Sequence, residues 1–174
     1  MSLTKRTGDS GTTTIFTNDT VRKDHPVIEA LGAYEELISR LGVAKLHIDR
    51  FSRTIERFQR SLVQIMGVLS SLGRVDCHDI EKEAHFLDVL VEEYDRDIGD
   101  RLTENVIPGE DMPSAELHLA RAACRQFERR VVALQSLITL DSNILKYVNR
   151  LSDVIYLMAV ISSESAHKDE EKFD

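Results

Sequence analysis

Hydrophobic residues recur at helical spacing over five long stretches of this chain. In an α-helix, positions three and four apart share a face, so such a run indicates a helix with one face in the core. The pattern predicts helices from residue 26 past residue 41, over about 49–72, 79–99 and 113–137, and from 141 to about 161. No stretch shows a convincing strand pattern. We predict an all-α fold, a five-helix bundle in a single domain over residues 1–174.

The two ends of the chain lack this pattern. Residues 1–24 are rich in Thr, Gly and Asp, which favour turns, and we expect an ordered loop or short hairpin there. Pro26 suits a first helical position, with Asp24 or His25 as the N-cap. The charged tail is expected to fray from Ser162, with residues 163–174 disordered.

Composition and charge narrow the function classes. The formal net charge of −8 argues against a nucleic-acid partner. No apolar run reaches the roughly 18 residues of a transmembrane helix, and the polar start lacks a signal core, so we expect a cytoplasmic protein without a membrane partner. Cys77 and Cys124 are too few for a disulfide framework. Phosphate-loop, serine-hydrolase and zinc-protease motifs are absent and the histidines are scattered, so we expect no protein-bound metal.

The segment 117–134 carries a polar row beside its apolar face. His118, Arg121, Arg125 and Glu128 recur at helical spacing next to a stripe that a core would bury. The forked donors of guanidinium match phosphate and carboxylate oxygens, so the row is suited to holding either group. A solvated face with a helical ion pair is the alternative. The apolar stripe consists of Leu117, Ala120, Cys124, Phe127, Val131, Leu134 and Ile138.

Two further segments offer candidate nucleotide contacts. Residues 7–14, TGDSGTTT, contain two glycines whose N–H groups can face an anion, and Lys5, Arg6 and Lys23 flank them. An ordinary turn has the same composition. Asn149 lies inside the last predicted helix, where asparagine is unfavourable. It indicates either a polar contact, such as a nucleotide group, or a surface position.

Six segments, taken in order, carry a family resemblance: TGDSGTTT, RKDHP, GAYEELISRLG, VIPG, LHLARAACRQFERRVVAL and YVNRLSDVIY. Together they resemble the PduO-type ATP:cob(I)alamin adenosyltransferases. The resemblance implies a homotrimer that holds ATP, with Mg²⁺, between neighbouring subunits. It implies that Co(I) of cob(I)alamin attacks the 5′-carbon of ATP and that triphosphate leaves. Since Co(I) is the nucleophile, the protein supplies alignment and positive charge rather than a general base.

The resemblance also assigns roles to individual residues and partners. Arg121, Arg125 and Glu128 are implied at the catalytic centre, with Arg121 paired to Glu35 across a subunit boundary. Asn105 is implied to face the corrinoid. A cobalamin reductase or a cobalamin-dependent enzyme is a further implied partner. The implied ATP contacts are Lys5, Arg6, Thr7, Gly8, Thr13, Thr14, Lys23, Arg125, Glu128, Arg129 and Asn149.

Five positions depart from the family pattern: Glu35, Ile38, Asn105, Glu110 and Gln126. Asn105 stands where a phenylalanine forms an apolar wedge below the corrin, and Gln126 stands where a second arginine faces phosphate. The loss of one charge-assisted contact costs roughly 1.5–3 kcal/mol. Three hypotheses stay open: an active adenosyltransferase, a weak or inactive paralogue that binds ATP or corrinoid as a carrier or regulatory module, and a bundle used only for assembly.

Overall fold

The structure is a computed structural model that describes residues 8–99, 108–109 and 111–170, with the backbone alone described over 164–170. Lys5, Arg6, Thr7, Asn105 and Glu110, named above, lie outside these residues. The helices and strands are β1 Thr12–Thr14, β2 Thr20–Arg22, α1 Pro26–His47, a short 3₁₀ turn Asp49–Phe51, α2 Ser52–Ser70, α3 Ile80–Ile98, α4 Met112–Leu134 and α5 Ser142–Glu170.

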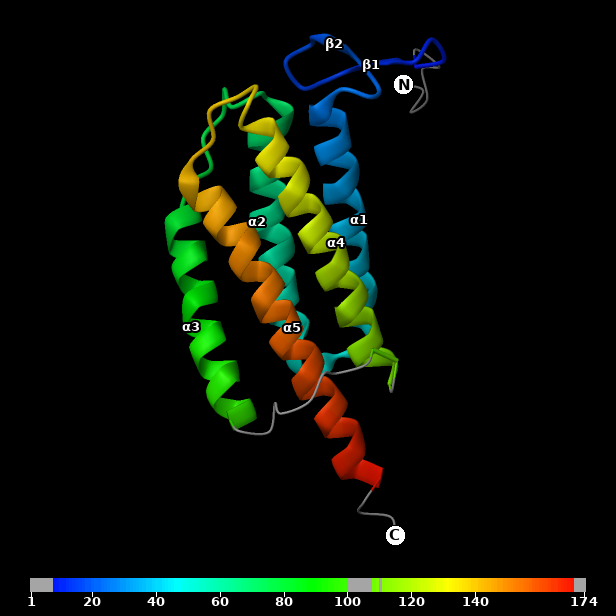
Figure 1. The fold of residues 1–174 in the computed structure, drawn as a ribbon, viewed down its shortest axis with the longest axis vertical. Helices are drawn as coiled ribbons and strands as arrows, with labels where there is room; N and C mark the ends of the chain where they lie inside the picture. Colours follow the sequence, from blue (N-terminus) through cyan, green and yellow to red (C-terminus); the bar gives the residue numbers. More distant parts are fainter. Residues whose placement is uncertain (1–7, 100–107, 110, 171–174) are drawn as a thin grey trace.

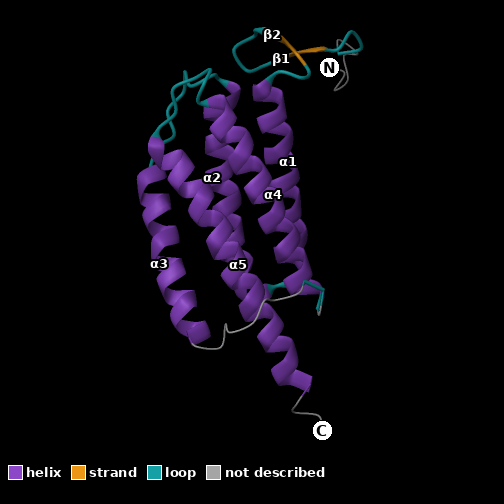
Figure 2. Ribbon diagram, in the orientation of Figure 1, coloured by secondary structure: helices purple, strands orange, loops and turns teal. Residues whose placement is uncertain are grey.

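Five helices lie side by side in one bundle, which confirms the predicted fold class (Figure 1, Figure 2). α1 packs against both α2 and α4, and α5 packs against both α4 and α3. The small antiparallel hairpin β1–β2 sits at the end of the bundle where α1 begins. α5 extends beyond the other helices at the opposite end. No helix in the described part of the chain is both long and apolar enough to span a membrane.

Side-chain caps set where the helices begin. His25 is the N-cap of α1, because its Nδ1 accepts a hydrogen bond from the Val27 N–H at 3.2 Å. Asp24 instead pairs with Arg22 at 2.7 Å. Asp111 caps α4 by accepting from the Ser114 N–H at 2.7 Å. Each cap satisfies a backbone donor that has no partner within its helix, so these residues fix the register of the helices that carry the site.

The predicted apolar stripes form the core of the bundle. Tyr34 and Phe127 pair across α1 and α4 with ring centroids 6.3 Å apart, and Tyr147 is fully buried on α5. Ile138, the last residue of the predicted stripe, packs against the core while only partly buried, as do Leu31, Ile38, Met66 and Val91. Helices with such a face gain most of their stability from this packing rather than from propensity.

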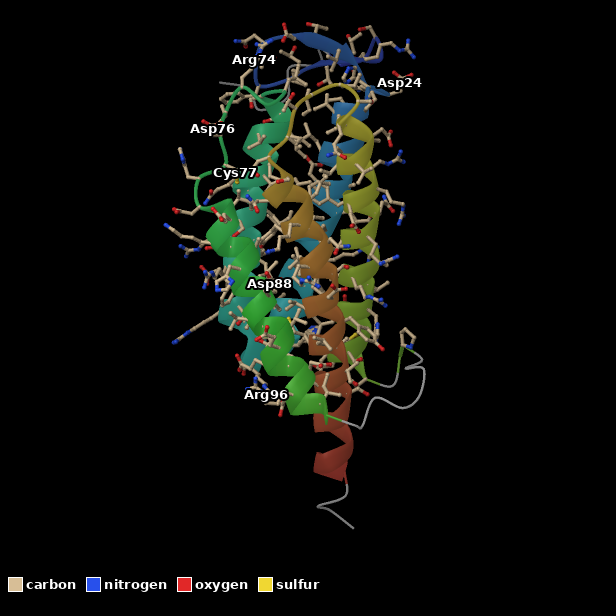
Figure 3. The ribbon with its side chains drawn as sticks, turned by 60° about the vertical axis from the view of Figure 1, so that its left-hand side comes forward. Asp24, Arg74, Asp76, Cys77, Asp88 and Arg96 are labelled. Carbon is tan, nitrogen blue, oxygen red and sulfur yellow. The ribbon has the colours of Figure 1, made fainter. Side chains whose placement is uncertain are left out.

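Charged side chains hold α3 against its neighbours. Asp88 of α3, labelled in Figure 3, accepts from Lys146 at 2.9 Å and from Arg150 at 2.8 Å, both on α5. On the α2 side, Arg57 forms two hydrogen bonds to Glu83 and lies over the Phe86 ring at 3.5 Å from its centroid. α3 and α5 also pack closely along their backbones. The contacts of Asp88 and of Arg57 therefore tie α3 to α5 on one side and to α2 on the other.

Helix boundaries differ from the sequence prediction at three places. The predicted second helix is divided into the 3₁₀ turn and α2, and α4 ends at Leu134, where the Ile138 N–H bonds back to the Leu134 carbonyl. The last helix is longer than expected, since α5 continues to Glu170, while the predicted fraying from Ser162 and disorder over residues 163–174 stay predictions. No proline or glycine interrupts residues 162–170, so each residue can extend the existing helix. Residues 171–174 lie outside the description.

Candidate nucleotide site

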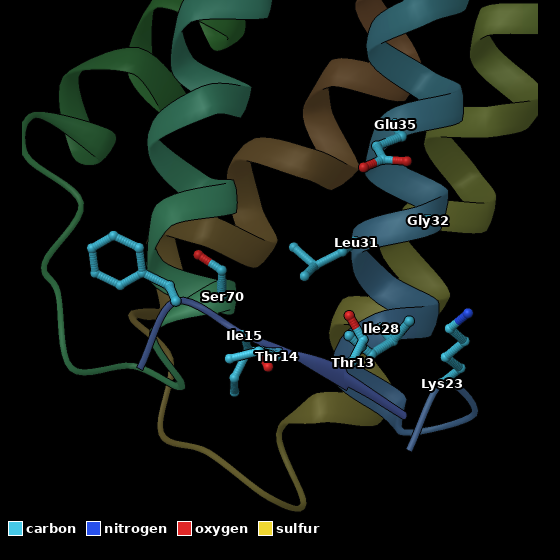
Figure 4. Close-up of a pocket in the computed structure, with 10 residues that line it drawn as sticks. Thr13, Thr14, Ile15, Lys23, Ile28, Leu31, Gly32, Glu35 and Ser70 are labelled. Carbon is cyan, nitrogen blue, oxygen red and sulfur yellow. The ribbon is translucent and has the colours of Figure 1, made fainter. Parts of the chain in front are cut away.

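A pocket of about 420 Å³ lies between the hairpin and the first turns of α1 (Figure 4). Its wall combines a lysine, a carboxylate and threonine hydroxyls with an apolar side formed by Ile28 and Leu31. This combination can hold a ligand that has both an anionic and an apolar part. The lining residues are Thr13, Thr14, Ile15, Phe16, Lys23, Ile28, Leu31, Gly32, Glu35 and Ser70.

The hairpin geometry brings the predicted loop residues to this pocket. Thr13 pairs with Val21 in the two-stranded ladder, and the Lys23 N–H donates to the Gly11 carbonyl at 2.9 Å. Gly11 has φ +80°, which favours glycine. A Cβ on Gly8 would lie 3.0 Å from Lys23 Nζ, so glycine leaves room for the lysine ammonium. Gly8, Thr13, Thr14 and Lys23 are therefore assembled at one end of the bundle.

The arginine row of α4 forms a second part of the predicted site. Arg125 and Arg129 are exposed, and neither makes a hydrogen bond or ion pair with another residue in the described segments. Glu128 is half-buried and accepts a hydrogen bond from Asn149 Nδ2 of α5 at 2.9 Å. Glu128 and Asn149 are thus tied together, while the exposed guanidinium groups of Arg125 and Arg129 have no partner in the described part of the chain.

Arg121 occupies a different environment on the same helix. Its guanidinium carbon lies 4.4 Å from the centroid of the Tyr156 ring on α5. His118 meets the same ring edge-on, with centroids 6.0 Å apart. Burial, together with the charge of Arg121, lowers the pKa of His118. The cluster therefore carries one positive charge rather than two near neutral pH.

The predicted site residues fall into two groups in a single chain. Thr13, Thr14, Lys23 and Glu35 line the pocket. The other described candidates for ATP contact are not among its lining residues, namely Gly8, Arg125, Glu128, Arg129 and Asn149. Among the described residues, an ion pair at 3.0 Å joins Arg130 of α4 to Glu29 of α1, and no ion pair joins Arg121 to Glu35. In the described segments, no group of three or more His, Cys, Asp or Glu side chains is arranged to hold a metal ion.

Some lining residues were not predicted from the sequence. Ile28 and Leu31 share the helical period of the core, so periodicity alone assigns them to the interior. Ser70 reaches the pocket from the end of α2, and Phe16 from the turn of the hairpin. Only the tertiary arrangement brings these two segments together. Tyr156 likewise gives no sequence signal of its contact with Arg121.

Comparison with known proteins gives consistent matches. The model of the family described as cobalamin adenosyltransferase matches residues 3–162. A corrinoid adenosyltransferase of Citrobacter freundii is 36% identical over 162 residues, covering 90% of this chain and 92% of that protein. The human corrinoid adenosyltransferase MMAB is 32% identical over 167 residues, covering 88% of this chain and 66% of that protein.

Two further matches extend the comparison. The corrinoid adenosyltransferase PduO of Salmonella typhimurium is 32% identical over 97% of this chain, which spans 52% of that longer protein. Among solved structures, a variant PduO-type ATP:corrinoid adenosyltransferase from Lactobacillus reuteri, complexed with cobalamin and ATP, superposes with a TM-score of 0.82. The alignment has 25% identity and covers 91% of this chain and 89% of that one.

Proposed function

The chain belongs to the cobalamin adenosyltransferase family, and we propose that it transfers the 5′-deoxyadenosyl group of ATP to the cobalt of a corrinoid. The observation that carries this proposal is the pocket at the hairpin, where Lys23, two threonines and Glu35 meet an apolar wall. ATP has the corresponding parts: an anionic triphosphate and a flat, largely apolar base. The relatives named above are corrinoid adenosyltransferases, which agrees with this ligand.

The proposed reaction needs alignment and charge rather than a proton carrier. The electron pair of Co(I) forms the new bond to the 5′-carbon, the carbon–oxygen bond breaks, and triphosphate leaves with that bond's electrons. Lys23 and the exposed Arg125 and Arg129 are suited to hold the triphosphate and stabilise the charge that develops on it. Mg²⁺ would accompany the phosphates as part of the bound substrate.

A site shared between subunits would unite the two groups of residues. We propose a homotrimer in which the hairpin pocket of one copy faces the α4 row of the next. In this arrangement Arg121 pairs with Glu35 of the neighbouring copy. The exposed apolar side chains Phe16 in the hairpin and Val132 near the end of α4 support an interface at this end of the bundle. Predicted partners beyond ATP and corrinoid, a cobalamin reductase or a cobalamin-dependent enzyme, stay predictions.

The departures from the family pattern affect this proposal unequally. Glu35 lines the pocket and retains the carboxylate that the proposed pair needs. Ile38 is partly buried and packs against the core, and it is not among the residues that line the pocket. Gln126 is exposed and removes one positive charge from the α4 row. The proposed phosphate contacts at Lys23, Arg125 and Arg129 do not depend on these positions.

An anaerobic turnover assay tests the proposal. Chemically generated cob(I)alamin, ATP and Mg²⁺ are mixed with the protein, and adenosylcobalamin is followed by its absorption spectrum while triphosphate is quantified. We expect equal amounts of both products. ATP binding without either product would favour the carrier or regulatory paralogue, and no ATP binding would favour a bundle used only for assembly.

A further inference from the structure

The surroundings of Arg121 form a cluster that the proposed chemistry does not explain. The guanidinium carbon is 4.4 Å from the Tyr156 ring centroid, within the range of a cation–π contact. His118, one turn earlier on α4, meets the ring edge-on at 6.0 Å. The Tyr156 ring thus lies between two side chains of α4, with the Arg121 guanidinium over its face and the His118 ring against its edge.

Two polar atoms of this cluster lack a partner among the described residues. Arg121 Nε and His118 Nε2 are both buried, and neither has a hydrogen-bond partner in the described part of the protein. Arg121 differs in this respect from Arg57 and Arg150, which carboxylates hold in place. The ring of Tyr156 is therefore the main contact that restricts how the Arg121 guanidinium is oriented.

We infer that Tyr156 is a positioning residue, whose ring holds the Arg121 guanidinium in the orientation that receives a carboxylate from a second copy of the chain. This inference rests on the proposed function, in which that carboxylate is Glu35 of the neighbouring subunit. A flexible arginine loses side-chain freedom when it pairs, and stacking on a ring restricts that freedom beforehand. His118 supports the ring from its edge, and its lowered pKa keeps a second positive charge away from Arg121.

A double-mutant cycle separates positioning from simple space filling. Tyr156→Leu removes the aromatic face but keeps an apolar side chain, and we expect kcat/KM for ATP to fall about tenfold, within the range of a desolvated cation–π contact. Tyr156→Phe keeps the face and should restore most of that loss. In an Arg121→Ala background, Tyr156→Leu should cause little further loss, because the group it positions is gone. Equal losses in both backgrounds would overturn the inference.

A second measurement reports on the contact without turnover. The chain has four tyrosines and no tryptophan, so 3-fluorotyrosine labelling gives few ¹⁹F resonances, and Tyr156→Phe identifies the one from Tyr156. We expect this resonance to shift in Arg121→Ala and to stay in place in the matched control Arg125→Ala. An unmoved resonance in Arg121→Ala would overturn the inference. If the parent shows no turnover, the proposed function fails, and the ¹⁹F shift alone decides whether Tyr156 holds Arg121.

Discussion

Arg125→Ala is the substitution that most cleanly separates ligand binding from folding. Arg125 is exposed on α4, and no hydrogen bond, ion pair or ring contact ties it to another residue of the described segments. Its removal therefore leaves no partner unsatisfied, and alanine is the best helix former at such a position. We expect the free energy of unfolding to change by less than about 0.5 kcal/mol.

The expected cost to ATP binding follows from the same observation. Since Arg125 has no internal carboxylate to leave, a phosphate would gain its full charge-assisted hydrogen bond, worth roughly 1.5–3 kcal/mol. That range corresponds to a loss of affinity of about 10- to 150-fold. Arg129, one turn on, is equally exposed and would retain part of the positive potential, which places the expected value nearer the lower end.

Isothermal titration with Mg·ATP measures this loss, and urea unfolding followed by circular dichroism measures stability. The matched control is Arg60→Ala, which removes an exposed arginine whose surface pair with Glu56 spans 2.7 Å. Arg60 lies on α2, away from the lining of the hairpin pocket. We expect unchanged ATP affinity in the control. An Arg125→Ala protein with intact helices and parental affinity would refute the assignment of the α4 row to phosphate.

Three further predictions follow from individual contacts. Glu128→Ala removes the acceptor that holds the Asn149 amide at 2.9 Å, so ATP affinity should fall several-fold. Adding Asn149→Ala to this variant should change the affinity little, and titration calorimetry on the two single variants and the double variant measures both effects. The pKa of His118 in the folded protein is below its ordinary value of 6.5. As the pH falls, the imidazole is therefore protonated in the unfolded chain before it is protonated in the folded one. The free energy of unfolding should decrease as the pH falls from about 6.5 through the pKa of the folded protein. In His118→Gln, urea unfolding should show a smaller decrease of the free energy of unfolding over this pH range. The same decrease as in the parent would contradict the prediction. Phe127→Ala removes a fully buried ring and should cost about 3–5 kcal/mol of stability in the same experiment; a loss below 1 kcal/mol would show that the core is packed differently.

The helical part of the fold could be predicted because its signal is local. Residues such as Ile55, Phe58, Leu62 and Ile65 repeat at the spacing of one helical face, and all four are fully buried. The α4 row could be predicted for the same reason, since Arg121, Arg125 and Glu128 are neighbours on one helix. The end of α5 could not, because a charged segment without proline or glycine is compatible with either helix or disorder.

The candidate site was predictable only in part, because its walls come from separate segments. Threonines and Lys23 flank a turn and are visible as candidates in the sequence. Ser70 and Phe16 reach the same pocket only after α2 and the hairpin pack at one end of the bundle. The stacking of Arg121 on Tyr156 depends on how α4 crosses α5, which no single-helix pattern specifies.

Subunit mixing tests the central claim most directly, namely that a hairpin pocket and an α4 row from two copies together transfer the adenosyl group. Lys23→Ala and Arg125→Ala proteins are each assayed anaerobically with cob(I)alamin, ATP and Mg²⁺, then dissociated, mixed in equal amounts and reassembled. With ATP kept well below the Kd of either variant, each variant alone should retain only a small fraction of the parental activity. Random reassembly of trimers should restore roughly a quarter of the parental sites, since an intact site needs an unaltered hairpin from one copy and an unaltered α4 from its neighbour. The parent protein, dissociated and reassembled in the same way, serves as the control and should recover its activity. If it does and the mixed trimers are still as inactive as the separate variants, the result contradicts a site shared between two copies.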